Sequence, residues 1–191
     1  MNRFARIIVG YHGCSEKFAR NILVGKQPIA DWKPSDNKWD WLGRGIYFWE
    51  HSPERALRWA QERYRGRRGH PAVIGAIIQL GTCFDLTNEE CAGILEESFK
   101  ELSRGFEAEA LELPTNSKAG GKRRELDCLA INDCLERLEE DGRRIDSVRG
   151  AFLEGPPVFP GTTILKETHI QIAVRNSACI LGVFRPNLTY E

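Results

Sequence analysis

The sequence predicts one domain of the α+β class. Apolar segments with the two-residue alternation of β-strands are interspersed with segments that repeat with the helical period, and no linker of different composition divides them. Connections between the strand-like segments near the C-terminal end are short, which favours antiparallel pairing. A chain of 191 residues is long enough for one domain with its own core. We therefore expect residues 1–191 to form a single unit.

The first two elements are predicted by "RIIVGYH" and the segment after it. Alternating apolar residues indicate a strand over residues 6–12. Ser15 is a suitable N-cap for a helix over residues 16–25, and Gly25 is a suitable end for it. A long polar loop over residues 26–45 follows, and long loops are often functional. The loop contains three tryptophans: Trp32, Trp39 and Trp41.

A second strand is predicted by "GIYFWE", residues 45–50. Alternation places Ile46 and Phe48 on one face of this strand and Tyr47 and Trp49 on the other. Three aromatic residues in a row are more than a surface segment needs. We expect one face to enter the core and Tyr47 to offer its ring to a planar ligand.

The remaining elements follow from helix-capping signals and apolar patterns. Ser52 is expected to cap a helix that has Pro53 at its first position. Thr87 and Glu90 are expected to form a capping box for another helix, which runs to Leu102. The other predicted elements are strands at 71–81, 146–155, 168–176 and 179–186, a helix at 125–142, and a flexible polar insertion at 103–124.

Composition and charge argue against several classes of protein. The formal net charge is zero, so no global field draws the chain to nucleic acid or to a membrane. No apolar run approaches the ~18 residues of a membrane-spanning helix, and the first residues lack the pattern of a signal peptide. We therefore expect a cytoplasmic protein without membrane contact. The cysteines form no CxxC pair, so we expect free thiols and no metal site; they are Cys14, Cys83, Cys91, Cys128, Cys134 and Cys179.

Three short stretches combine residue types that ligand sites use. In "GYHG", His12 ends a strand and Gly13 lets a ligand approach the backbone. In "GRGIYF", two glycines lead into the strand that carries Tyr47. In "HIQIAV", His169 and Gln171 share a face beside a small alanine, which indicates a lined cleft. Each stretch alone also fits a structural role: a strand-end histidine, aromatic core packing and a solvent-facing strand side.

Taken together, "YHG", then "GRGIYF" followed by a capped helix, then a late strand bearing Glu or Gln resembles the ADP-ribosyltransferase fold. The resemblance is to its diphtheria-toxin and poly(ADP-ribose) polymerase branch, whose signature is His, Tyr, Glu. It spans residues 7–175, although the middle helical region gives no clear match. It implies a split pair of small, packed, mainly antiparallel sheets with flanking helices. It also implies that NAD is bound as a substrate without a Rossmann fingerprint, and no GxGxxG follows a strand here.

The resemblance implies a role for each matching residue. His12 would hydrogen-bond the adenosine-side ribose of NAD, and the Gly13 backbone would hold the nicotinamide carboxamide. Tyr47 would stack on the nicotinamide ring, with Tyr11 or Phe48 supporting it. These roles require the imidazole, the phenol ring and the late strand to line one crevice.

The sequence departs from the family signature at one position, where Gln171 stands in place of the glutamate. A glutamine can hydrogen-bond ribose hydroxyls, but it has no charge with which to act as a base or stabilise an oxocarbenium ion. A carboxylate from elsewhere, Glu154 or Glu167, could supply that charge. His169 stands where related toxins carry a target-selecting residue, and it could act as a base. The candidate catalytic residues are therefore Gln171, His169 and Glu154.

The resemblance and the glutamine together imply single-unit transfer rather than polymer growth. We expect an NAD-dependent mono-ADP-ribosyltransferase that modifies a protein or nucleic acid, as in a bacterial toxin or defence effector with an inhibitory partner protein. Three alternatives stay open: NAD hydrolysis with water as the acceptor, transfer of a 2′-phosphate from RNA, and a degenerate module that only binds NAD or ADP-ribose. A basic turn either grips a phosphate backbone or is simply solvated; its arginines are Arg63, Arg65, Arg67 and Arg68.

Overall fold

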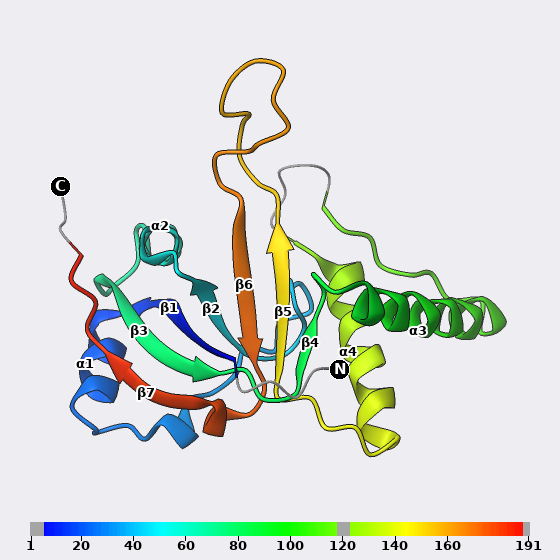
Figure 1. Cartoon of the computed structure of the whole chain (residues 1–191), viewed down its shortest axis with the longest axis horizontal. Helices are drawn as coiled ribbons and strands as arrows, with labels where there is room; N and C mark the ends of the chain where they lie inside the picture. The colour runs from blue at the N-terminus through cyan, green and yellow to red at the C-terminus, as the bar shows by residue number, and fades with distance from the viewer. Residues whose placement is uncertain (1–5, 118–122, 189–191) are drawn as a thin grey trace.

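A seven-stranded β-sheet runs through the molecule in the computed structural model, which describes residues 6–117 and 123–188 (Figure 1). The helices lie on both of its faces. In chain order the elements are β1 (Ile7–Ser15), α1 (Glu16–Leu23), η1 (Ile29–Asp31), β2 (Ile46–Glu50), α2 (Pro53–Tyr64), β3 (Pro71–Gln79), β4 (Cys83–Asp85), α3 (Glu89–Ala108), α4 (Glu125–Glu140), β5 (Ser147–Phe152), β6 (His169–Val174), η2 (Ser177–Cys179) and β7 (Ile180–Phe184), where η denotes a 3-10 helix.

The predicted α+β class is confirmed, but the two sheets implied by the resemblance are joined into one. The strand order is β4-β5-β6-β2-β1-β3-β7, and every neighbouring pair is antiparallel except β4 and β5. The joint is β2, which pairs with β6 over four residues but with β1 only through Gly10↔Glu50 and Tyr11↔Trp49. The strands on the two sides of this narrow joint run in different directions in Figure 1.

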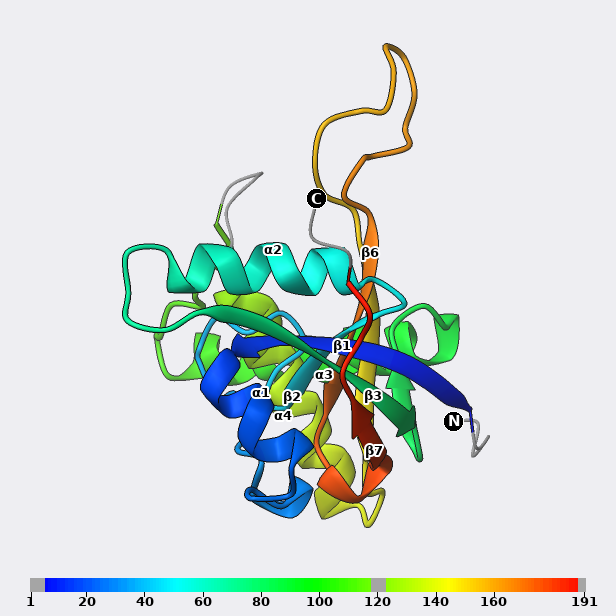
Figure 2. The same cartoon turned by 90° about the vertical axis from the view of Figure 1, so that its left-hand side faces the viewer.

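The two faces of the sheet are both covered, and the strand alternation decides which residues each face receives. We call one the α1 face: Phe48 and Ile172 pack there with α1 and Trp32. We call the other the α2/α4 face, where α2 packs on Trp49 and α4 packs near Tyr47. Figure 2 shows α1 and α2 on opposite sides of β1. The aromatic strand β2 therefore has no solvent-facing side.

The first helix begins as predicted, but the second is capped differently. The Ser15 hydroxyl oxygen accepts the Phe18 N–H at 3.2 Å, so Ser15 is the N-cap of α1. In α2, Pro53 is the first residue as predicted, yet the Ser52 side chain makes no capping hydrogen bond. The fixed φ of a proline at the first position suits a helix start without a side-chain cap.

The predicted capping box of α3 is wrong by one residue. Asn88 is the N-cap, and its side-chain oxygen accepts the Glu90 N–H at 2.8 Å. The Thr87 hydroxyl instead donates to the Asp85 carboxylate at 2.7 Å. Asparagine and threonine are both good caps, and the carboxylate two residues earlier captures the threonine.

The middle of the chain holds more regular structure than the sequence predicts. Helix α3 continues to Ala108, so the first residues of the predicted insertion at 103–124 are helical. Residues 118–122 of that insertion lie outside the described residues. The short strand β4 was not predicted at all, and it pairs in parallel with β5. Residues 153–168 form a long loop that projects beyond the sheet between β5 and β6 (Figures 1 and 2).

Two further findings bear on the chemistry available to the chain. All six cysteines are free thiols. Each helix in the described part of the chain is either too short or too polar to cross a bilayer.

Candidate functional site

The three candidate catalytic residues converge on one buried cluster at the start of β6, on the α2/α4 face. Gln171 lies in register with Trp49 of β2 on one side and Gly150 of β5 on the other. His169 lies in register with Phe152 of β5. His169 and Gln171 are both buried, although the sequence pattern predicted a lined cleft at this strand.

The hydrogen bonds of His169 fix its tautomer. The Gln171 amide nitrogen lies 2.9 Å from His169 Nε2, and His169 Nδ1 lies 2.7 Å from the Glu167 carbonyl oxygen. An amide nitrogen only donates, so Nε2 accepts and Nδ1 carries the proton that is donated to Glu167. Burial lowers the pKa of His169 below its usual 6.5, which agrees with a neutral ring. The neutral imidazole therefore holds the Gln171 amide in one orientation.

Glu154 brings a carboxylate to the same cluster. It forms an ion pair with Arg55 of α2, and its Oε2 lies 3.7 Å from His169 Nδ1. The side chains of Arg55 and Glu154 are only 12% and 19% exposed. Arg55 contacts Glu154, Glu154 contacts His169, and His169 contacts Gln171. Only the His169 ring therefore separates the Glu154 carboxylate of the projecting loop from the Gln171 amide.

Two aromatic rings pack against His169 in this cluster. Phe152 stacks on the His169 ring with a centroid distance of 5.8 Å, and Trp41 of the long loop lies 6.1 Å from it. The Arg124 guanidinium lies over Trp41 at 5.0 Å. Trp41, one of the three tryptophans in the loop over residues 26–45, thus packs against the candidate catalytic residues.

Three buried side-chain N–H groups around the cluster have no hydrogen-bond partner. They are Nε1 of Trp49, Nε of Arg55 and Nε of Arg124, and they are the buried unpaired polar side-chain atoms found in the described ranges. Trp49 is the register neighbour of Gln171, and the two arginines contact Glu154 and Trp41. Buried polar groups in proteins are nearly always paired, so each of these donors is expected to meet an acceptor. The acceptor is either bound water or a ligand rich in oxygen atoms.

Tyr47 lies on the same face, but its hydroxyl is used internally. The hydroxyl donates to the Gly43 carbonyl oxygen at 2.6 Å and accepts the Leu42 N–H at 2.8 Å. Burial raises the pKa of Tyr47 well above its usual value. Gly43 has a φ of 70°, which a glycine adopts freely, so the glycine-flanked turn bends the loop onto the ring. The hydroxyl of Tyr47 is therefore already paired, and the side chain as a whole is half-buried.

His12 does not share a crevice with Tyr47, contrary to the expectation above. Its ring packs on the α1 face, with centroids 4.8 Å from Trp32 and 5.7 Å from Phe48. Burial lowers the pKa of His12 to about 4. The two residues meet through the backbone, because His12 Nδ1 lies 2.8 Å from the Tyr47 carbonyl oxygen. Phe48 is fully buried beside His12, so it supports the histidine and not the tyrosine.

The His12–Tyr47 bond lies where the pairing of β1 with β2 ends. The β1–β2 ladder ends at Tyr11↔Trp49, two residues before Gly13. The His51 N–H donates to the Val9 carbonyl, so Val9 and every second residue after it direct their backbone groups toward β2. Gly13 is one of these residues. In a continued ladder its N–H would donate to the Tyr47 carbonyl, but the His12 imidazole binds that carbonyl instead. The Gly13 N–H and C=O are therefore directed toward β2 without a partner in the ladder, although Gly13 itself is buried.

The remaining sequence candidates have structural surroundings of their own. A Cβ at Gly13 would lie 2.4 Å from the Ala56 carbonyl oxygen, so the packing of α2 also requires glycine there. Tyr11 makes an edge-to-face contact with Phe184, at 6.2 Å between centroids. In the described part of the chain, no group of three or more His, Cys, Asp and Glu side chains is arranged to hold a metal ion.

Arg55, Trp49 and Arg124 were not among the sequence candidates. Arg55 stands four residues before Trp59, on the face of α2 that the apolar residues marked as inward, and this spacing was the available signal. Nothing local distinguishes Arg124 from its neighbours. No protein-family model, curated protein or solved structure matches this chain.

Proposed function

We propose that the protein acts in the cytoplasm and transfers a single ADP-ribose unit from NAD to a macromolecule, either a protein or a nucleic acid. The observation that carries this proposal is the end of the β1–β2 ladder before Gly13, which leaves one N–H and one C=O directed toward β2 without a ladder partner. A primary carboxamide offers one C=O and one NH₂ group, so it complements these two backbone groups. The nicotinamide end of NAD therefore has matching partners beside Tyr47.

The unpaired donors support the same ligand. The diphosphate and ribose groups of NAD are rich in acceptor oxygens, and the N–H groups of Trp49, Arg55 and Arg124 lack acceptors.

The residues of the cluster suit the steps of the transfer. The bond between ribose C1′ and the nicotinamide nitrogen breaks, and nicotinamide leaves with the electron pair. An acceptor nucleophile then attacks the oxocarbenium-like sugar and loses its proton. In this proposal Gln171 binds the ribose hydroxyls, Glu154 stabilises the developing positive charge, and His169 positions the Gln171 amide.

The test incubates the protein with cell lysate and NAD that is labelled in its adenosine part. Nicotinamide release reports cleavage, and label on a macromolecule reports transfer. We expect the wild-type protein to release nicotinamide and to label an acceptor. Gln171→Ala and Glu154→Gln are each expected to lower turnover by roughly a hundredfold, as the loss of one stabilising group in a buried site does. Glu112→Gln, at an exposed position on the loop after α3, is the matched control and should leave turnover unchanged. Failure of the folded wild-type protein to release nicotinamide would overturn the proposal.

A binding module is the second candidate, because Gln171 is uncharged and the Glu154 carboxylate is already paired with Arg55. Calorimetry with NAD separates the two. Binding without turnover, unchanged in Gln171→Glu, identifies a module that only holds the nucleotide. Release of free ADP-ribose without any labelled acceptor identifies an NAD glycohydrolase instead.

A further inference from the structure

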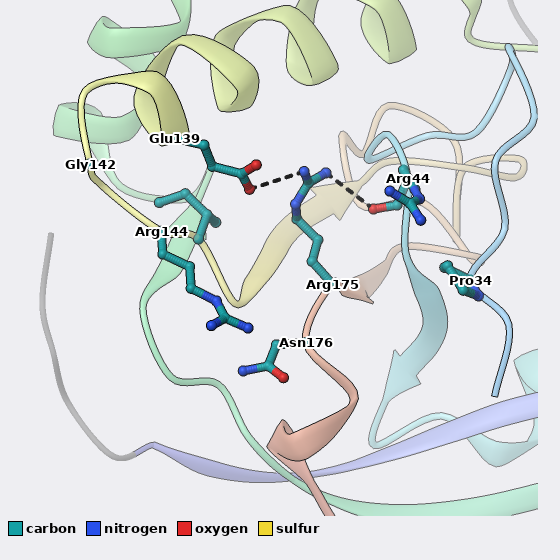
Figure 3. Close-up of a pocket in the computed structure, with 8 residues that line it drawn as sticks. Pro34, Arg44, Glu139, Gly142, Arg144, Arg175 and Asn176 are labelled. Atoms are coloured by element: carbon teal, nitrogen blue, oxygen red, sulfur yellow. Dashed lines mark hydrogen bonds and ion pairs between the residues drawn. The ribbon is translucent and has the colours of Figure 1, made fainter. Parts of the chain in front are cut away.

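A pocket of about 540 Å³ opens at the far end of β6, away from the cluster of His169 and Gln171 (Figure 3). Its volume falls in the range of small-molecule sites, about 300–1,000 Å³. Three arginines and one glutamate contribute charge to its walls. The lining residues are Pro34, Arg44, Glu139, Gly142, Arg144, Ile145, Arg175 and Asn176.

Arg175 is held in place at the centre of this pocket. It directly follows β6, and its side chain is only 14% exposed. One Nη atom lies 3.2 Å from the Glu139 carboxylate, and the other lies 3.5 Å from the Arg44 carbonyl oxygen, as the dashed lines in Figure 3 show. An arginine fixed in this way loses little conformational entropy when a ligand arrives.

The other two arginines are exposed and are held less tightly than Arg175. Arg44 is exposed, and its guanidinium forms no ion pair with the described residues. Arg144 is 76% exposed, and its Nε lies 3.8 Å from Asp146, beyond hydrogen-bonding distance. The Asp146 carboxylate is already bound by the Thr82 N–H at 3.0 Å and by the Asn176 amide at 2.8 Å. Asp146 keeps its negative charge beside Arg144, so Glu139 and Asp146 offset two of the three guanidinium groups and one positive charge remains in excess.

We propose that this pocket binds the phosphate or diphosphate group of a small, nucleotide-sized ligand. Guanidinium groups match phosphate oxygens in geometry and charge, and several of them around one cavity favour a dianion over a carboxylate. Pro34 and the buried Ile145 supply apolar wall for the rest of the ligand. A concave site of this size takes a small molecule, whereas a nucleic-acid backbone would need an extended basic surface.

The pocket is separate from the candidate active site. Gln171 and Arg175 are four residues apart along one strand, about 13 Å at the usual rise. The fully buried pair Val148↔Ala173 fills the α2/α4 face between them. The proposal therefore does not depend on the proposed transfer reaction.

The experiment is calorimetry at constant ionic strength with inorganic phosphate, pyrophosphate and ADP as probes, because surface charge effects are screened by salt. We expect pyrophosphate and ADP to bind, and Arg44→Ala and Arg144→Ala each to weaken binding by about tenfold or more. Arg104→Ala removes one exposed charge from α3, outside the pocket, and should bind like the wild type. ADP binding tighter than pyrophosphate identifies a nucleotide ligand, and equal affinities show that only the phosphates are read.

Three results would overturn the proposal. They are no binding of any probe, an equal loss in Arg104→Ala, and an equal loss of NAD turnover in Arg44→Ala. The last would make the pocket part of the NAD site, whereas a failure of nicotinamide release alone would leave it standing.

Discussion

Single side chains decide how the backbone of this protein is paired at the candidate site. The His12 imidazole replaces a backbone N–H as the partner of the Tyr47 carbonyl, and the neutral His169 ring fixes the Gln171 amide. Both histidines are neutral for the same physical reason, since burial disfavours the charged form. A protonated ring at either position would be unfavourable, because the surrounding groups shield it from water.

The desolvation of the half-buried His12 ring makes stability depend on pH in a defined direction. The folded protein holds the pKa of His12 at about 4, below the 6.5 of an exposed histidine, so the unfolded chain binds the proton more tightly. The stabilisation is complete above pH 6.5 and is lost as pH falls from 6.5 towards 4. We expect this to cost up to about 3 kcal/mol.

Urea unfolding of the wild type and of His12→Gln at several pH values measures this contribution. A glutamine can still donate to the Tyr47 carbonyl but does not titrate in this range. We expect the difference in unfolding free energy between the two proteins to shrink as pH falls. His70→Gln, at an exposed histidine, should follow the wild type. If the unfolding free energies of His12→Gln and the wild type changed with pH in parallel, the lowered pKa of His12 would be contradicted.

At the scale of elements, Gly13 lies where helix α2 packs on β1 and where the pairing of β1 with β2 ends. A Cβ at this position would meet the Ala56 carbonyl oxygen at 2.4 Å, and a backbone atom cannot move aside without displacing α2. We expect Gly13→Ala to destabilise the protein by about 1–3 kcal/mol, the usual cost of overpacking. Gly93→Ala is the contrasting substitution, because Gly93 lies in α3 with open space around it.

Thermal unfolding of the two variants distinguishes a specific clash from a general intolerance of alanine. Gly93→Ala should raise the melting temperature, because alanine stabilises a helix interior by about 0.5–1 kcal/mol relative to glycine. A Gly13→Ala protein as stable as the wild type would show that α2 can shift away from β1. Such a shift would also weaken the case that the unpaired backbone groups of Gly13 are fixed in position.

The elements that were predicted well are those with a strong local signal. The alternation in "HIQIAV" fixes which residues of β6 share a face, and Ser15 caps α1 through its own hydroxyl. Strand β4 was missed because three residues carry too little periodicity to detect. The Thr87 cap was wrong because two adjacent residues are both suitable, and a neighbouring carboxylate decides between them.

The candidate site was predictable only where its residues share a strand or a motif. His169 and Gln171 lie two residues apart on one strand, so their proximity follows from alternation. The contact of Glu154 with His169 needed the path of the projecting loop, and the face of His12 relative to Tyr47 needed the register of β1 against β2. Register between distant segments is set by tertiary packing, which the local sequence does not encode.

At the scale of the whole molecule, the narrow joint at β2 raises the question of what holds the two halves of the sheet together. Part of the answer is an ion network on the α1 face. Arg149 of β5 reaches across β6 to Glu50 of β2 at 2.7 Å and also binds Asp85 of β4 at 3.1 Å. The Arg149 side chain is 9% exposed and that of Glu50 is 12% exposed. One guanidinium thus ties the joint strand to the far edge of the sheet.

Removing this guanidinium should destabilise the whole fold and not one element. Arg149→Ala would leave the Glu50 and Asp85 carboxylates largely buried without their partner, a change that costs about 3–5 kcal/mol. Arg137→Ala is the matched control, since Arg137 also contacts two acidic side chains, Asp133 and Glu101, but is 42% exposed. Its loss should cost less than about 1 kcal/mol. Urea unfolding monitored by tryptophan fluorescence and by far-ultraviolet circular dichroism measures both variants. We expect Arg149→Ala to shift the two signals together, because β2 belongs to both halves of the sheet. A shift no larger than that of Arg137→Ala would mean that backbone pairing through β2 is enough to hold the two halves together.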